Sequence, residues 1–222
     1  MLAYGTSAQA LQAFLRKRIL ARNAVCEQFI DAQATPLARA CREMAARFVA
    51  GGRLLAFGRG AYATDAMHVS VEFIHPVIVG KRALPAMDVS MAPQAWTQTI
   101  ANEHDMAIAF GPPRGDADLN AVLLAARARG AMTIAWPGAD ADYAVTSPSD
   151  DAHVHQELFE LLGHTMYESV QVFLEHLSRH EGDHEGLGFL YPFLENAPQP
   201  EEDVLGEVAA SIRMKGADAN AL

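Results

Sequence analysis

Two side chains that can exchange protons, His68 and Glu72, stand four residues apart in a segment with the pattern of a helix. This spacing places them on one face of the helix, where they can serve one substrate or bind one metal ion. An exposed ion pair on a helix surface has the same spacing. The pair is therefore a candidate catalytic or metal-binding unit that needs partners from elsewhere in the chain.

A second polar group opens the last long segment with a helical pattern and includes Gln156 and His164. These residues are eight apart, which is two turns along a helix and within roughly 80° around its axis, so both can reach one cleft. The other polar residues of the group are His153, His155, Glu157 and Glu160. The alternative is that Gln156 and His164 form the polar edges of an apolar stripe that packs against the body.

A glycine-containing turn precedes the helix that carries His68. An apolar run at residues 54–57 ends in Gly58-Arg59-Gly60. In a parallel sheet, ligands bind beyond the carboxyl ends of the strands, where backbone N–H groups at the start of a helix attract anions. The turn suits an anion, although a tight connection between a strand and a helix favours glycine for steric reasons as well.

The elements that must position these residues follow from an alternation of short apolar runs and helical patterns after Gly52, which is typical of a parallel sheet with crossover helices. The expected strands span residues 53–57, 84–89, 105–110, 131–136 and 143–146, and the expected helices span residues 62–73, 93–103, 116–129 and 150–177. We predict an α/β fold, a three-layer α/β/α sandwich of flavodoxin-like type with a five-stranded, mainly parallel sheet.

The segment before the sheet, residues 1–51, has two helical patterns. The first runs from Ser7, a candidate N-cap, to about Gln33, and the second starts near Pro36, which suits a first helical turn. We therefore predict an N-terminal helical hairpin, within a single domain of residues 1–179. Residues 180–222, with an aromatic stretch at 189–194, are predicted to form a C-terminal extension.

Composition narrows the classes of function. The formal net charge is −10, without a run of basic residues, so we expect no direct binding of nucleic acid and no binding to an anionic membrane. The chain lacks a signal-peptide pattern at its start and an apolar run long enough to span a bilayer. Two cysteines are too few to indicate a disulfide framework, so we expect a cytoplasmic protein.

Together these stretches resemble the phosphoheptose isomerases, which are sugar isomerase (SIS) domain proteins that act on sedoheptulose 7-phosphate. The resemblance rests on Asp65-Ala-Met-His68 with Glu72, and on Gln156 with His164. It implies that Glu72 is the base and His164 the acid of an aldose–ketose isomerisation, and that His68, Glu72, Gln156 and His164 can hold zinc. It also implies a homo-oligomer, a tetramer or a dimer, built through the first and last helices.

The two loops that bind phosphate in that family have different residues here. Arg59 and Tyr62 replace an asparagine and a serine of the first loop, and Gly111-Pro-Pro-Arg114-Gly-Asp116 replaces a loop rich in serine and threonine. The candidate substrate-binding residues are Arg59, Gly60, Tyr62, Arg114 and Asp116. The arginines can bind phosphate or carboxylate, or can pair with nearby aspartates. The leading hypothesis is an isomerase of a phosphorylated or otherwise anionic sugar, and the alternative is a non-catalytic SIS module that binds a ligand or a protein.

Overall fold

Five short strands form one parallel sheet in the order β2-β1-β3-β4-β5. The computed structural model describes residues 7–76, 80–180 and 201–221. The strands are β1 (Leu54–Gly58), β2 (Ala86–Asp88), β3 (Met106–Phe110), β4 (Met132–Trp136) and β5 (Tyr143–Ala144). In the central pairs, Met106 of β3 lies opposite Leu54 of β1 and Met132 of β4. Every residue of β1, β3 and β4 is buried, because helices cover both faces of the sheet.

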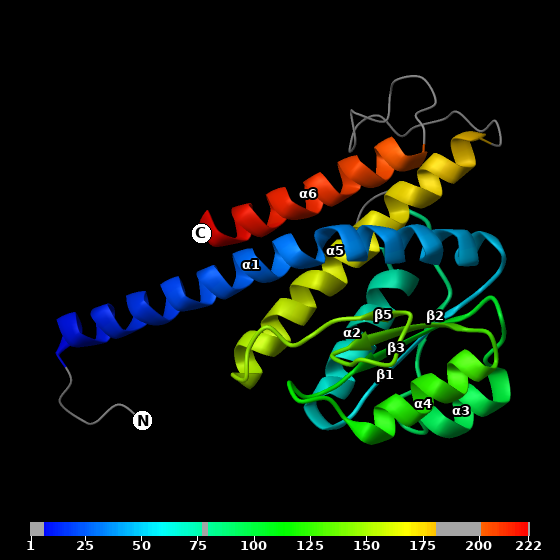
Figure 1. Cartoon of the computed structure of the whole chain (residues 1–222), viewed down its shortest axis with the longest axis horizontal. Coiled ribbons are helices and arrows are strands. Elements are labelled where there is room, and N and C mark those ends of the chain that lie inside the picture. The colour runs from blue at the N-terminus through cyan, green and yellow to red at the C-terminus, as the bar shows by residue number, and fades with distance from the viewer. Residues whose placement is uncertain (1–6, 77–79, 181–200, 222) are drawn as a thin grey trace.

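Alternate residues of each strand point to opposite faces, and each face has its own helices. Leu54 and Ala56 belong to the core shared with α1 (Ala8–Val49), α2 (Ala63–Ile74) and α5 (Ala152–His180). Leu55 and Phe57 belong to the core shared with α4 (Ala117–Ala128), beside α3 (Pro93–Ile100). Figure 1 shows α3 and α4 on one side of the sheet and α1 and α5 on the other. The predicted three-layer α/β sandwich with a five-stranded sheet is confirmed.

The predicted N-terminal hairpin is wrong, because α1 is a single helix of 42 residues with Pro36 inside it. Proline removes one backbone hydrogen bond and costs about 3 kcal/mol in a helix interior. The buried stripe formed by Ile30, Ala34, Leu37 and Cys41 continues across the proline at helical spacing. Burying each large apolar side chain contributes roughly 1.5–3 kcal/mol, so this packing outweighs the lost bond.

A sixth helix, α6 (Glu201–Ala221), follows the predicted domain end and packs along α1 (Figure 1). Its apolar stripe, which includes Val204, Val208 and Ile212, is buried, and a side chain at Gly216 would meet Ile30 Cγ2 at 2.6 Å. The predicted extension therefore contains a helix that the sequence reading did not assign. The aromatic stretch at 189–194 lies outside the described residues.

The first half of α1 extends past the sheet (Figure 1) and presents large apolar side chains to the outside. Leu11, Phe14, Leu15, Ile19 and Leu20 are each between 38% and 59% exposed. Ion pairs from Arg18 to Asp151 and from Arg22 to Glu157 hold this half against the start of α5. None of the described helices combines the length and apolar character needed to cross a bilayer.

Candidate active site

Helix α2 starts directly against the end of β1, and this junction sets the position of its polar face. A Cβ atom at Gly58 would lie 2.1 Å from the carbonyl oxygen of Tyr62, so only glycine fits there. Gly60, with φ of +62°, then opens a short 3₁₀ turn (Gly60–Tyr62) that leads into α2. Asp65, His68 and Glu72 follow one another in α2 at spacings of three and four residues, so they lie on one face of the helix.

Helix α5 carries the facing residues at intervals of four, namely Gln156, Glu160 and His164. Its opposite face is anchored in the core by Leu158, Leu162 and Met166, which are fully buried. The two helices come close together at Gly163, where an added Cβ would lie 3.1 Å from Val69 Cγ2. The glycine beside His164 thus permits the approach that brings the two polar faces together.

Glu72 lies between two imidazoles from the two helices. Its Oε1 is 3.6 Å from His68 Nε2, and its Oε2 is 3.3 Å from His164 Nδ1. The rings of His68 and His164 meet edge to face with centroids 5.0 Å apart. The structure therefore brings together three of the four residues that the resemblance singled out as a site.

The fourth, Gln156, uses its amide nitrogen to donate a hydrogen bond of 2.7 Å to Oδ1 of Asp65. Asp65 is 2% exposed, and its Oδ2 has no hydrogen-bond partner among the residues that the structure describes. Burial raises the pKa of Asp65 to about 7, opposed by the hydrogen bond from Gln156 and reinforced by the neighbouring Glu160 carboxylate. Asp65 thus lies in the same polar layer as the histidines.

Glu160 also belongs to the cluster formed by Asp65, His68, Glu72 and His164, although its position in the sequence did not assign it to the site. Its Oε2 contacts His68 Nδ1, so His68 has a carboxylate at each ring nitrogen. One ligand atom each from His68, Glu160 and His164 lies within 4.8 Å of the others. The sequence indicated only that Glu160 shares a helix face with Gln156 and His164, because it stands midway between them at helical spacing.

The exposure of these side chains differs in a way that suits proton transfer. The side chains of His68 and His164 are 40% and 48% exposed, whereas that of Glu72 is 12% exposed. A molecule in solution can therefore reach both imidazoles. The carboxylate behind them is held in a less solvated position, where an electrostatic interaction is stronger than in water.

The two loops that contain Arg59 and Arg114 are held by interactions within the protein. Asp116 is the N-cap of α4, and its Oδ1 accepts hydrogen bonds from the N–H groups of Asp118 and Leu119. Arg59 is paired with Asp116 at 3.4 Å and contacts Asp118 as well. Arg114 is 88% exposed and lies 4.0 Å from Asp150. Of the two arginines, Arg114 has the more weakly held guanidinium.

A buried histidine connects the two loops to α5. His155 is fully buried, and its Nε2 donates to the carbonyl oxygen of Gly111 over 2.9 Å. Burial lowers the pKa of His155, so the neutral ring accepts a hydrogen bond at Nδ1 from Ser147 Oγ over 2.8 Å. The ring of Tyr62 packs edge-on against His155 with centroids 5.6 Å apart. Tyr62 therefore packs against the histidine that connects α5 to the loop at Gly111.

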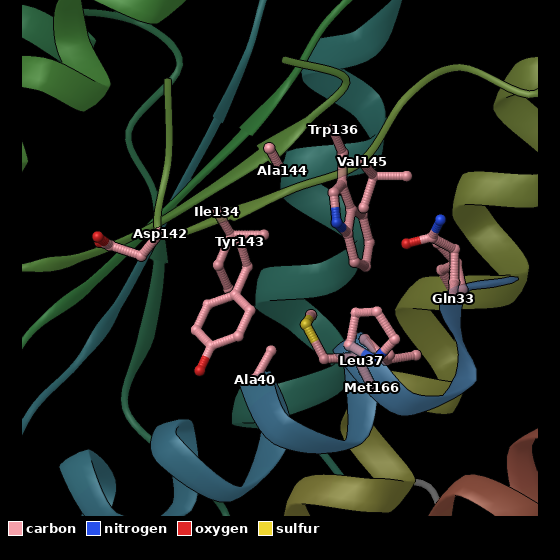
Figure 2. A pocket seen from close by; sticks show the side chains of 12 residues that line it. Gln33, Leu37, Ala40, Ile134, Trp136, Asp142, Tyr143, Ala144, Val145 and Met166 are labelled. Carbon is pink, nitrogen blue, oxygen red and sulfur yellow. The ribbon is translucent and has the colours of Figure 1, made fainter. Parts of the chain in front are cut away.

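A separate cavity of about 180 Å³ lies between α1, α5 and the β4–β5 edge of the sheet. Figure 2 shows Leu37 and Met166 facing Trp136 and Val145 across it, with Gln33 and Asp142 on opposite sides. Most of its lining is apolar, and the carboxylate of Asp142 is already hydrogen-bonded to Thr133 and Arg127. This cavity lacks the arrangement needed for acid–base chemistry.

No family model matches the chain, but curated proteins resemble it. The phosphoheptose isomerase of Solidesulfovibrio magneticus is 28% identical over 158 residues, which cover 61% of this chain and 77% of the relative. That of Thermodesulfovibrio yellowstonii is 28% identical over 174 residues, which cover 68% of this chain and 86% of the relative.

Solved structures of two phosphoheptose isomerases share the fold. The structure from Francisella tularensis has a TM-score of 0.58 at 18% identity, covering 75% of this chain and 98% of the other. The structure from Neisseria gonorrhoeae has a TM-score of 0.58 at 20% identity, covering 74% of this chain and 98% of the other.

Proposed function

We propose that this chain, a SIS-fold protein similar in sequence to phosphoheptose isomerases, interconverts an aldose phosphate and a ketose phosphate. The observation that carries the proposal is the position of Glu72 between His68 and His164. Aldose–ketose isomerisation needs one group that takes a proton from carbon and one that exchanges a proton with oxygen. A carboxylate and an accessible imidazole on opposing helices supply both groups.

In the proposed reaction, Glu72 takes the proton from the carbon next to the substrate carbonyl. The electrons of that C–H bond form the carbon–carbon double bond of an enediol, while His164 donates a proton to the carbonyl oxygen. The neighbouring hydroxyl then returns a proton to His164, and Glu72 delivers its proton to the former carbonyl carbon. The carbonyl has moved by one carbon, and both side chains have regained their starting protonation states.

The same side chains fit a zinc ion, which we propose as an optional cofactor. Two imidazoles and carboxylate oxygens from two helices form a suitable donor set, and one atom each from His68, Glu160 and His164 already lies within 4.8 Å of the others. By resemblance, the ligands would be His68, Glu72, Gln156 and His164. When bound, such an ion would polarise the substrate carbonyl oxygen, the task that His164 performs by proton donation in its absence.

The anionic end of the substrate must be bound differently from that in the family, because Asp116 already accepts hydrogen bonds from two backbone N–H groups at the start of α4, those of Asp118 and Leu119. We propose that Arg114 contacts the phosphate, since its present partner Asp150 is 4.0 Å away and the side chain is exposed. Arg59 is a second contact only if the phosphate displaces Asp116 or Asp118. The backbone of Gly60 and the ring of Tyr62 would border this end of the site.

We further propose a cytoplasmic homo-oligomer. The exposed apolar side chains of Phe14, Ile19 and Leu20 on α1 favour burial against another copy, and both cysteines are free thiols. Light scattering after size-exclusion chromatography tests the assembly. Replacing Phe14 and Ile19 by serine is expected to lower the measured mass, while an unchanged mass would exclude this face as the contact.

The function is tested by incubating the full chain with sedoheptulose 7-phosphate and with hexose and pentose phosphates, and identifying products by mass spectrometry and NMR. We expect one ketose or aldose phosphate to be isomerised, and Glu72→Gln to lower the rate of product formation by about 10²–10⁴-fold. Glu157→Gln, the same change on an α5 carboxylate that pairs with Arg22, is the matched control. Absence of product from every sugar phosphate, with the protein folded, would contradict the proposal.

A further inference from the structure

Among the described residues, the carboxylate of Glu160 has no cationic partner other than a histidine, although its side chain is only partly exposed. Within the described part of the chain, the ion pairs of Glu160 and Glu72 are with His68 and His164 alone. Asp65 adds a third carboxyl group beside them and forms no ion pair there. The cluster thus contains three carboxyl groups and two imidazoles without a lysine or an arginine, and a divalent cation would balance this charge.

The contacts of His68 distinguish the two carboxylates that flank it. His68 turns Nδ1 to Glu160 and Nε2 to Glu72. A histidine that binds a metal through one nitrogen commonly donates the N–H of the other nitrogen to a carboxylate, which fixes the ring. An ion placed between Nδ1 and Glu160 would therefore leave Glu72 in the outer position, as the acceptor for Nε2–H.

The contacts of His164 agree with that arrangement. Its Nδ1 faces Glu72 at 3.3 Å, and a hydrogen bond donated there leaves Nε2 with a lone pair for the ion. Ligand atoms around a tetrahedral zinc ion lie roughly 3.3 Å apart, since each bond is about 2.0–2.2 Å. His68 Nδ1 and Glu160 Oε2 are already in contact, so an ion between them requires these two atoms to separate, while His164 moves inward from its place within 4.8 Å. The side chains of His68 and His164 are 40% and 48% exposed, which allows both adjustments.

Gln156 is occupied in a different way. Its amide nitrogen donates to the buried Asp65, which holds the side chain toward α2 at the level of Asp65. A neutral amide oxygen is also a weaker zinc ligand than a carboxylate. Both observations favour the carboxylate of Glu160, one turn farther along α5, over the amide of Gln156.

We propose that Glu160, with His68 and His164, forms the zinc-binding set of this protein, and that Glu160 takes the place expected for Gln156. Glu72 then lies outside the ligand set and stays available as the base. The choice of zinc rests on the proposed function, whereas the choice of ligands rests on the contacts of these side chains.

The test measures zinc binding by the full chain without substrate, using competition with a chromophoric chelator. Glu160→Gln is expected to weaken zinc binding by at least about tenfold, because loss of even an outer partner of a metal ligand costs roughly 10–100-fold. The loss of zinc affinity in Gln156→Ala is expected to be smaller than the loss in Glu160→Gln by a factor of at least about ten. Glu160→Asp, which keeps the charge, is expected to retain more affinity than Glu160→Gln. Glu157→Gln is the matched control and should leave the affinity unchanged.

Thermal melting of each metal-free variant separates loss of a ligand from loss of folding. A loss of affinity in Gln156→Ala that equals or exceeds the loss in Glu160→Gln would overturn the assignment, as would a wild-type protein that binds no zinc. Turnover of sugar phosphate by the metal-free protein is measured separately. The ligand assignment can therefore fail while the isomerase proposal stands, and the reverse.

Discussion

Gly58 sets the position of α2, the helix that carries the candidate site, relative to β1, and replacing this glycine by alanine tests that role. An added Cβ would lie 2.1 Å from the carbonyl oxygen of Tyr62 and 2.8 Å from the nitrogen of Ala63, whereas ordinary contact begins at 3.4 Å. Because both neighbours are backbone atoms, no side-chain rotation relieves the clash. The start of α2 must move by more than about 1 Å relative to β1, as these distances require.

Overpacking of a well-packed junction costs about 1–3 kcal/mol. Each 1 kcal/mol lowers the midpoint of thermal unfolding by roughly 2–4 °C in a domain of this size. The clash is at the severe end of this range, about 2–3 kcal/mol, so we expect Gly58→Ala to lower that midpoint by about 4–12 °C. Misplacement by 1 Å can cost about 10²-fold in rate, so isomerase turnover should fall as well.

Differential scanning calorimetry of Gly58→Ala and Gly206→Ala is the assay. Gly206 lies within α6, and a Cβ added there would have no atom within 4 Å, so alanine should stabilise the protein by about 0.5–1 kcal/mol. A midpoint for Gly58→Ala within 1 °C of the wild-type value, at roughly the precision of the method, would refute the reasoning from the junction.

Two further predictions concern other parts of the fold. Because burial lowers the pKa of His155, the unfolded state binds more protons than the folded state below about pH 6.5, and the free energy of unfolding should fall as the pH drops through that value. Urea unfolding at a pH above and a pH below this value should show the fall in the wild type and a smaller fall in His155→Gln. An equal fall in the two proteins would contradict the prediction. Ala40 is buried and lines the 180 Å³ cavity, so Ala40→Leu should fill space and stabilise the protein by about 0.5–2 kcal/mol; a lower midpoint of urea unfolding would instead indicate a cavity too narrow for the added atoms.

The sheet could be predicted from the sequence because its central strands are fully buried. β1, β3 and β4 begin and end within one residue of the expected positions, since each is an apolar run bounded by residues that favour turns. Pro36 led to the wrong prediction of a second helix, because its local preference for a first helical turn is overridden by the burial of the apolar stripe of α1. That stripe is recognised only when α5 and α6 are in place against it.

The candidate site could be predicted in part. His68, Glu72 and His164 were identifiable by type and spacing, and the fold brings them together. The contact of Glu160 with His68 depends on how α2 and α5 cross at Gly163, which no local pattern encodes. The pairing of Arg59 with Asp116 and Asp118 likewise joins two loops that only the sheet brings side by side.

The most direct test of the central claim compares substrate binding and turnover in the wild type and in Glu72→Gln. The sugar phosphate that yields product is used, with its dissociation constant measured by calorimetry and its turnover by NMR. Removing a positioned base costs typically about 10²–10⁴-fold in rate, so we expect turnover to fall by that factor while the dissociation constant changes by only a few-fold. A Glu72→Gln variant that isomerises the sugar at the wild-type rate would contradict the account.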